Sequence, residues 1–570
     1  MDKRFFLALF LSLIVIAISQ LLFPPVRPKP GSQTTGAKDS TVASGATASS
    51  TPGPLPGQRA SSTPVAVRVP PVVRAGSGDS ISRIPRLSAA EAETTTVVTP
   101  KAVYRFSNVG AAPASIVVRE YESRSVTNTL VDLGVPGSNL LRFRVLTPAD
   151  TIELSEIPFV LTRGKGSDNS EVLTYSGTRG STAISIQYAI PVDTAASYTM
   201  RVQGRITGAQ TPAYLITELP GTLRPTEADT VGDHRSLAYS FKPTRDHAKS
   251  VLFGSLDPGE KTLVPGPLNW AAIKNKYFVF GILAPTTGAQ FSEATLTGGP
   301  RTSKIATTAS ASVVEQLRDG TFSFDVYSGP QESQRLQRMG RDFDHVNPYG
   351  WRFLQSIVHP IASKVIQALL WMHHRLNLSY GWVLVILGVL VRLALWPLNQ
   401  STMRSSLKMQ ELQPKLAAAQ KKYKDPVQQR EAIMKVYHDA GVSPFAGLTG
   451  CLPALLPMPI LFALFFVFQN TIEFRGVPFM WLHDISIKDP LYILPLLMGA
   501  SMYVLSWIGM RNAPPNPQAK MMGYMFPVMM TVVLLNMASG LNLYYTAQNI
   551  AALPQQWLLA RERAKARLSG

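Results

Sequence analysis

Long apolar runs fill much of the last third of the chain, and they constrain the fold more than any other feature. A further apolar run, "FFLALFLSLIVIAISQLLF", lies close to the N-terminus at residues 5–23. At about 1.5 Å per helical residue, runs of this length nearly match or exceed a hydrocarbon layer of about 30 Å. The later runs occupy residues 380–398, 448–468, 491–510, 521–537 and 541–560. We therefore predict a helical membrane protein with six spans.

Composition agrees with a membrane protein and limits its chemistry. Only 16% of the residues are charged, whereas 45% are hydrophobic. The net charge of +19 favours polyanionic partners, either nucleic acid or anionic lipid head groups. The one cysteine, Cys451, excludes an intrachain disulfide and a cysteine-rich zinc site. We expect no metal and no other cofactor, because the later spans contain neither histidine nor carboxylate.

The segments before the later spans differ sharply in composition and in residue pattern. Residues 1–23 are interpreted as an uncleaved signal anchor, although Ala17-Ile18-Ser19 leaves a cleaved signal peptide open. Residues 24–95 are rich in Pro, Ser, Thr and Gly and are expected to be a flexible linker. Residues 96–333 contain many short β-type runs separated by turn residues, which predicts an antiparallel sandwich. Residues 334–378 are expected to form amphipathic helices along the membrane surface.

Basic residues predict the orientation of the membrane core, residues 379–560. A polar segment at 399–445 has leucines at helical spacing and a break at "KDP", which indicates a basic helical hairpin. This hairpin, the tail at 561–570 and the N-terminal Lys3 and Arg4 all fall on one side of a chain that crosses six times. Positive residues favour the cytoplasm, so both termini are predicted to be cytoplasmic and the β domain to lie outside.

One charge stands inside an apolar run: Arg392 in "VILGVLVRLALWPLNQ". A charge at the bilayer centre costs about 2.5–3.5 kcal/mol on insertion scales, so an arginine there requires an explanation. Three remain open, namely snorkelling to the head groups, a structural pair, and a hydrated cavity that attracts an anion. No later span offers an acidic partner, but neutral polar residues exist near the span ends: Gln469, Asn470, Asn542, Tyr544, Tyr545, Gln548 and Asn549.

Several motifs in order resemble the YidC membrane insertase family. They are "VRLALWPLNQSTMRSSLKMQELQPKL", "GCLPALLPMPILFALF", "FMWLHDISIKDPLYILPLLMGASMY" and "SGLNLYYTAQNI". A weaker likeness in the β region, as in "WAAIKNKYFVFGILAP", resembles the periplasmic domain of the Gram-negative-type members. That resemblance implies a β-supersandwich of the mutarotase-like kind, in a protein of the bacterial inner membrane.

The resemblance also implies a water-filled groove, open to the cytoplasm and to lipid, that receives the substrate. Its arginine matches Arg392, an aromatic from the last span matches Tyr545, and Gln548 lies one turn nearer the C-terminus. An apolar slide includes "PMPI", with Met458 and Leu461. The family often has a hydroxyl residue where this chain has Gly388, so its polar network is not carried over.

The implied function is insertion and folding of newly made membrane proteins, alone or with the Sec translocon, without catalytic residues. Nascent membrane proteins, the ribosome and the lipid bilayer are the expected partners, and no sequence-specific nucleic acid is expected. Four basic residues of the hairpin are expected to touch the ribosome or the nascent chain: Lys421, Lys422, Lys424 and Arg430. Two other functions stay open, a carbohydrate-binding or carbohydrate-modifying protein acting through the β domain, and a small-solute transporter.

Overall fold

The computed structural model describes the β region and most of the helical region of the chain. The described residues are 93–192, 198–288, 290–301, 304–347, 355–397, 400, 415–416, 418–419, 422, 425–439, 458–511 and 517–568. They all belong to the second of two compact units, Ile84–Gly570. The expected first span at 1–23 and nearly all of the expected linker lie outside the described residues.

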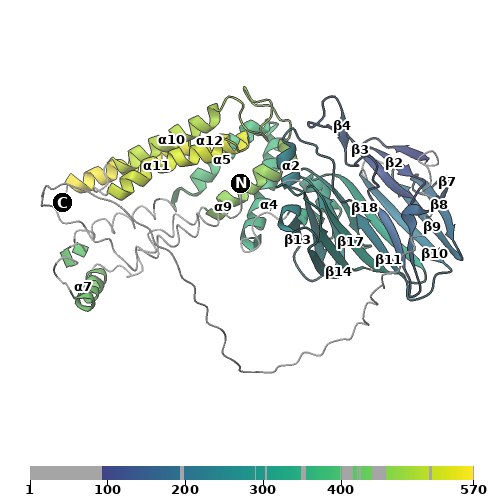
Figure 1. Ribbon diagram of the computed structural model, residues 1–570. Helices are drawn as coiled ribbons and strands as arrows, with labels where there is room; N and C mark the ends of the chain where they lie inside the picture. Colours follow the sequence, from purple (N-terminus) through teal and green to yellow (C-terminus); the bar gives the residue numbers. More distant parts are fainter. Residues whose placement is uncertain are drawn as a thin grey trace, which may run out of the picture. The chain divides into compact units, whose positions relative to one another are not determined.

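Antiparallel strands form two sheets between residues 94 and 330 (Figure 1). The smaller sheet has the order β1 (Thr94–Val98), β2 (Ala102–Ser107), β3 (Ala112–Glu122) and β4 (Leu130–Asp132). The larger sheet has the order β6 (Thr151–Glu153), β5 (Arg142–Leu146), β11 (Tyr214–Leu219), β17 (Ala309–Gln316), β16 (Phe291–Gly298), β14 (Lys261–Lys274), β15 (Phe278–Leu283), β18 (Thr321–Pro330), β10 (Thr199–Thr207), β9 (Thr182–Ile190), β8 (Glu171–Arg179) and β7 (Val160–Lys165). Off this path, β12 (Ala238–Pro243) pairs with β13 (Lys249–Leu252) and β14. Short helical segments are η2 (Leu154–Glu156), α2 (Thr230–Arg235) and η3 (Phe253–Ser255).

Side-chain alternation explains why these segments are strands. In β9, the buried Ile184, Ile186 and Tyr188 alternate with residues that are more exposed. A period of two places such residues on one face of a sheet, which then covers the core. β15 differs, because all of its residues are buried and both of its faces are therefore covered. The expectation of an all-β domain is confirmed.

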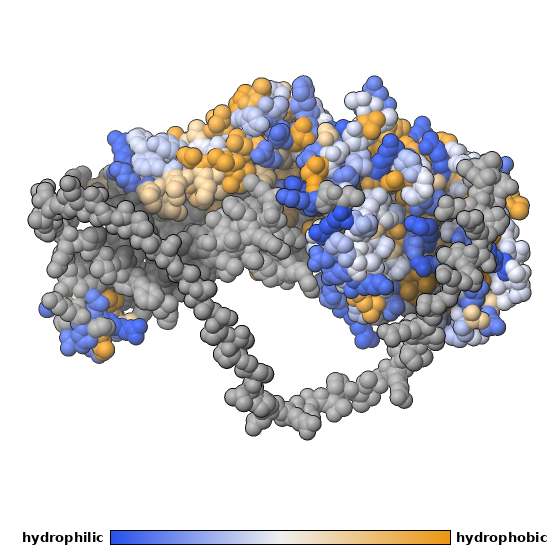
Figure 2. All heavy atoms as spheres, viewed as in Figure 1, coloured by the Kyte–Doolittle hydropathy of each residue, from blue (hydrophilic) through white to orange (hydrophobic). Residues whose placement is uncertain are grey.

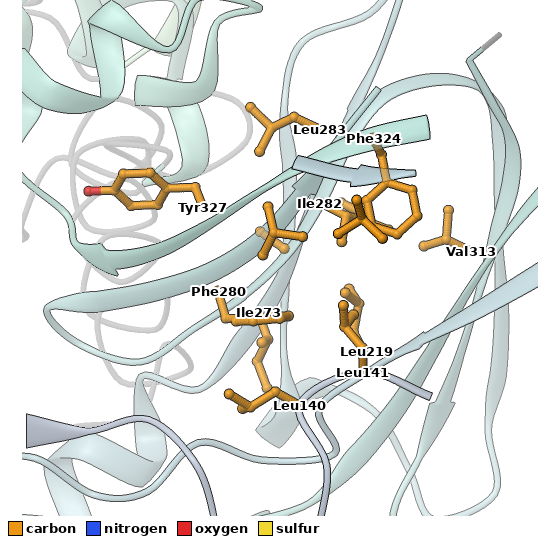
Figure 3. Close-up of a cluster of buried hydrophobic side chains, with 14 of the residues drawn as sticks. Leu140, Leu141, Leu219, Ile273, Phe280, Ile282, Leu283, Val313, Phe324 and Tyr327 are labelled. Carbon is orange, nitrogen blue, oxygen red and sulfur yellow. The ribbon is translucent and has the colours of Figure 1, made fainter. Parts of the chain in front are cut away.

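One apolar core holds the β domain together. Figure 3 shows part of it, in which side chains such as Ile273 of β14, Phe280 of β15 and Phe324 of β18 gather in one cluster. Aromatic rings strengthen the packing, for example Trp270 edge-on to Phe343 with ring centroids 5.3 Å apart.

The expected boundary at residue 334 is wrong. α3 (Ser333–Arg338) and η4 (Phe343–Val346) pack on the β domain instead of forming interfacial helices, and their Leu336, Phe343 and Val346 belong to its buried core. The amphipathic pattern in this stretch comes from covering a sheet, which needs the same apolar stripe as lying on a membrane. The long amphipathic helix is α4 (Gln355–Leu376).

The helices that follow are α5 (Tyr380–Ala394), α7 (Pro426–Asp439), α9 (Met458–Asn470), α10 (Ile493–Met510), α11 (Pro517–Leu534) and α12 (Ser539–Leu568), with the short η5 (Ile472–Phe474) after α9. All of them except α7 contribute buried residues to a second apolar cluster, together with α4. α12 packs against α5, α9 and α10, α10 also packs against α11, and α4 packs against α5 and α9. The expected tail at 561–570 continues α12 as far as Leu568.

The surface of this helical part is apolar. Figure 2 shows hydrophobic residues gathered over the area of α10 and α12, whereas hydrophilic residues are spread widely over the β domain. On α10, for example, Leu496, Val504 and Trp507 are more than 40% exposed. Contiguous exposed apolar side chains of this kind are rare on protein surfaces that face water. Among the described residues, Ile493–Met510 is the one helix long and apolar enough to cross a bilayer by itself. Tyr380–Ala394, Pro459–Asn470 and Lys520–Leu534 are apolar but shorter.

Candidate substrate groove and loop anchor

Arg392 lies in the last turn of α5, on a helix whose other residues are almost all apolar. Its side chain is half-buried, and the buried Nε has no hydrogen-bond partner among the described residues. The described part of the chain also offers it no ion pair. A guanidinium in this state keeps its charge and its donors available, so it can attract an anion.

Gly388, one turn before Arg392, brings α5 into close contact with α12. A Cβ atom at Gly388 would lie 3.0 Å from the carbonyl oxygen of Tyr544 and 3.2 Å from the Cβ of Ala547. It would also lie 3.3 Å from the backbone nitrogen of Gln548. Glycine is thus the residue that allows these two helix backbones to approach so closely.

α5 and α12 run side by side in the same direction, as contacts at three successive levels along the two helices show. Near the first turn of α12, a Cβ at Gly540 would lie 3.2 Å from Leu384 of α5. Gly388 meets Tyr544 further along, and beyond the end of α5 the carbonyl of Trp396 accepts a hydrogen bond from Gln555 Nε2 at 3.2 Å. Along α5, Arg392 lies between the second and the third level.

The neutral polar residues of α12 divide into two groups. Asn542 donates to the carbonyl of Leu534 at 3.1 Å, and Asn549 donates to Ser501 Oγ at 3.1 Å, so both bind neighbouring helices instead of Arg392. Tyr544 is fully buried against Phe468. Tyr545 and Gln548 are half-buried, on the stretch of α12 that meets Gly388.

Of the residues expected in the apolar slide, Met458 begins α9 and Leu461 is half-buried on the same helix. α9 contacts α12 at its far end, where Phe468 packs against Tyr544 with ring centroids 6.0 Å apart. The preceding residues 451–457, with Cys451 and the first proline of "PMPI", lie outside the described residues. The structure therefore places Gly388 and Gln548 together, and it places Met458 and Leu461 on a helix next to theirs.

Two of the four hairpin residues are described. Arg430 is exposed on α7, and Lys422 is an exposed helical residue before it. Lys421 and Lys424 lie outside the described residues.

Sequence reasoning missed a buried polar anchor between the loop after α9 and the β domain. Arg475 Nε donates to Glu227 Oε1 at 2.7 Å, and Arg475 also donates to the carbonyl of Glu122 at 2.8 Å. Nearby, Arg124 of the β domain pairs with Asp484, whose other carboxylate oxygen accepts from the backbone of Ser486 at 2.8 Å. The available signal was Arg475 itself, the one arginine in the loop at 471–490, which has few other basic residues.

A second feature missed from the sequence is the set of exposed methionines on α11. Met521, Met522 and Met525 are 58%, 41% and 49% exposed. Methionine side chains are flexible and polarisable, so such a surface adapts to apolar partners of different shape. The repeated methionines in "KMMGYMFPVMM" were the available signal.

Two family models match the chain over most of its length. The model described as YidC periplasmic domain matches residues 135–363, and the model described as 60Kd inner membrane protein matches residues 371–566.

Curated relatives agree with these matches. A membrane protein insertase YidC of Chlorobaculum tepidum is 27% identical over 528 residues, which cover 85% of this chain and 85% of the relative. The YidC of Chlorobium phaeovibrioides is 31% identical over 353 residues, which cover 57% of this chain and 60% of the relative.

The chain is also similar to solved structures. An active YidC insertase crystal structure covers 82% of this chain and 92% of its own, with 19% identity and a TM-score of 0.33. A galactose mutarotase-like protein from Lactobacillus casei covers 42% of this chain, with 11% identity and a TM-score of 0.29.

An all-β domain followed by helices with an apolar surface, together with these matches, defines the class of inner membrane proteins that have a folded periplasmic domain. Within that class, the chain belongs to the YidC membrane protein insertase family.

Proposed function

We propose that this chain inserts newly made proteins into the inner membrane and helps them to fold. The observation that supports this most directly is Arg392, a half-buried guanidinium on an apolar helix whose Nε lacks a partner among the described residues. Such a charge is costly in hydrocarbon unless water or a passing anion reaches it. The relatives named membrane protein insertase supply the activity that fits this arginine.

The proposed architecture has six spans, with the first at residues 5–23 and five around a hydrated groove. The five core spans correspond to α5, α9, α10, α11 and α12, of which the span expected at 448–468 begins outside the described residues. Groove residues are proposed to be Arg392, Gly388, Tyr545, Gln548, Met458 and Leu461. In this arrangement Gly388 sets the α5–α12 spacing, and Arg392 provides the charge.

The mechanism needs only binding of the client's tail and partition of its apolar helix into lipid. A client's extracellular tail must cross hydrocarbon, where its carboxylates are expensive. Water in the groove shortens the apolar barrier, and Arg392 attracts the carboxylates where charge pairs are stronger than in bulk water. The apolar client helix then moves sideways into lipid, which supplies the driving force. No covalent bond changes, so neither catalytic residues nor a cofactor are required.

The proposed orientation has both termini in the cytoplasm and the β domain, a mutarotase-like supersandwich, in the periplasm. The exposed Arg430 of α7 and the neighbouring hairpin lysines would then face the ribosome or the emerging chain, by electrostatic attraction to phosphate without reading sequence. The Sec translocon is the proposed partner for larger clients.

Depletion of the protein, followed by protease mapping of newly made inner membrane proteins, tests the function. We expect client tails to remain accessible from the cytoplasmic side. Deletion of the β domain separates this function from a carbohydrate-modifying one, because an insertase keeps most insertion whereas such an enzyme loses all activity. Solute uptake into proteoliposomes would instead support a transporter.

A further inference from the structure

An open hollow of about 520 Å³ lies between α3 and α4, outside the candidate groove. From α4 it is lined by Gln367, Trp371, His374 and Arg375, of which Gln367, Trp371 and Arg375 recur every four residues and so share one helix face. α3 contributes the amides of Gln334 and Gln337 to the opposite wall. None of the residues that line the hollow is acidic. Its volume falls within the range of roughly 300–1,000 Å³ that is typical of ligand sites.

The connection between α4 and α5 fixes the level of this hollow relative to the membrane. Arg375 precedes the start of α5, at Tyr380, by five residues. The ring of His373 stacks on that of Tyr380 with centroids 4.0 Å apart, and its Nδ1 lies 2.6 Å from the carbonyl oxygen of Leu378. These contacts hold the end of α4 against the entrance of α5. In the proposed orientation, Arg375 therefore lies at the head-group level of the outer leaflet.

Apolar side chains beside the hollow complete a surface that suits lipid. Trp371 is 62% exposed, and Leu376, at the end of the same helix, is 47% exposed. Tryptophan is enriched at membrane interfaces, where its ring contacts both acyl chains and head groups. A soluble phosphate compound would leave these apolar surfaces in water, whereas a phospholipid covers them.

We propose that this hollow binds the head group of an anionic phospholipid of the outer leaflet. Arg375 and His374 donate to the phosphate, because a guanidinium suits bidentate recognition of phosphate oxygens. The amides of Gln334, Gln337 and Gln367 bind head-group hydroxyls, and the acyl chains pass along Trp371. The site thus fixes the edge of α4 to the bilayer. This inference rests on the proposed orientation of the chain.

Native mass spectrometry of the full chain in detergent tests the site, with dioleoyl-phosphatidylglycerol and dioleoyl-phosphatidylcholine added separately. A basic residue near a membrane surface contributes about 1 kcal/mol, so Arg375→Ala is expected to weaken phosphatidylglycerol binding about five-fold. Arg338→Ala is the matched control, because Arg338 is exposed on α3 but does not line the hollow. We expect this control to change binding less than about two-fold and phosphatidylcholine binding to be alike in all variants.

Two results would overturn the proposal. Equal loss of phosphatidylglycerol binding in Arg375→Ala and Arg338→Ala would show diffuse attraction without a site. Binding of soluble glycerol 3-phosphate that depends on Arg375 and matches the lipid would show a site for free phosphate compounds. Arg375→Gln serves as a second variant if the alanine variant does not fold. Arg375-dependent phosphatidylglycerol binding by a wild-type chain that fails to support insertion would count against the proposed function and leave this site standing.

Discussion

Arg475, in the loop after α9, donates from Nε to Glu227 Oε1 of the β domain at 2.7 Å, with side chains that are only 4% and 7% exposed. The same guanidinium lies near the rings of Tyr121 and Phe278, with its central carbon 6.0 Å and 5.8 Å from the ring centroids. When either partner of an ion pair this deeply buried is removed, the remaining charge stays buried without a partner, which destabilises the folded state. The contact joins the loop after α9 to the β domain.

Arg475→Ala is therefore expected to destabilise the protein by about 3–5 kcal/mol, because Glu227 stays buried without its partner. Thermal unfolding of the detergent-solubilised full chain measures the loss. Arg163→Ala is the control, since Arg163 and Glu171 form an exposed pair at 3.8 Å that is worth at most about 1 kcal/mol. Equal shifts in the two variants would contradict a special role for the Arg475 pair.

Glu473, two residues before Arg475, makes stability depend on pH. Burial, and then the nearby Glu332, raise the pKa of Glu473 from 4.5 to about 7. Because the folded state holds this proton more tightly, Glu473 costs no stability below pH 4.5, and its cost grows until the pH exceeds about 7. We expect Glu473→Gln to unfold at a higher temperature than the wild type at pH 8 and at a similar temperature at pH 4. A constant difference across this range would rule out titration of Glu473 as the cause.

Gly388→Leu is expected to push α5 away from α12 and to destabilise their contact by about 1–3 kcal/mol. The reason is that even a Cβ atom there would approach the carbonyl oxygen of Tyr544 to 3.0 Å. Limited proteolysis and insertion measured in cells report the loss. Leu390→Phe, at a position on the same helix that is 49% exposed, is expected to be tolerated. Normal insertion by the Gly388→Leu variant would show that close approach of these helices is not required.

Arg392 is tested with clients that differ only in the charge of their extracellular tails. Lys is expected to substitute tolerably, because a point charge suffices in water where no bidentate geometry is fixed. Ala is expected to impair acidic tails most and neutral tails least, in proportion to tail acidity. Snorkelling predicts that Ala is tolerated by every client, and a structural pair predicts loss of folded protein in both variants. Equal insertion of acidic and neutral tails by the Ala variant would exclude the groove-charge mechanism.

Reversal of Lys421, Lys422 and Lys424 to Glu tests the basic hairpin. Attraction to phosphate depends on salt, so the triple variant is expected to bind ribosomes more weakly, with a reduced salt dependence. The helices that follow are expected to stay folded, as judged by protease resistance. Reversal of the acidic neighbours Asp425 and Glu431 to Lys is the matched control and is expected not to weaken binding. If the triple Lys-to-Glu variant associates with ribosomes and inserts clients as the wild type does, the hairpin serves only to set the orientation of the chain.

The sequence predicted those elements that local pattern determines. Alternation of apolar residues predicted the β domain, as β9 illustrates, and apolar length predicted helices at α5, α10, α11 and the first part of α12. The pattern could not show what an apolar stripe covers. For that reason the stretch around Leu336 and Phe343 was predicted to lie on a membrane although it packs on a sheet.

Contacts between residues that are far apart in the chain could not be predicted from the sequence either. Arg475 and Glu227 are far apart in the chain, and neither is marked by its neighbours as a buried ion. The sequence did show that Arg392 lies well inside an apolar run and that the later spans contain no acidic residue. That Asn542 and Asn549 bind neighbouring helices, and leave Tyr545 and Gln548 as the half-buried polar groups, depends on packing that only the structure shows.

α12 is one continuous helix of 30 residues that carries Tyr545 near one end and the basic sequence "RERAKAR" near the other. Its length of about 45 Å exceeds the hydrocarbon thickness of about 30 Å. We therefore expect that a tilt of its basic end would displace the polar residues next to Gly388. Pro554 lies between the two ends and lacks the backbone N–H that would continue the helical ladder. We expect any bending of α12 to be concentrated at Pro554, so the stiffness of the helix at this residue would determine how far a tilt of one end is transmitted to the other.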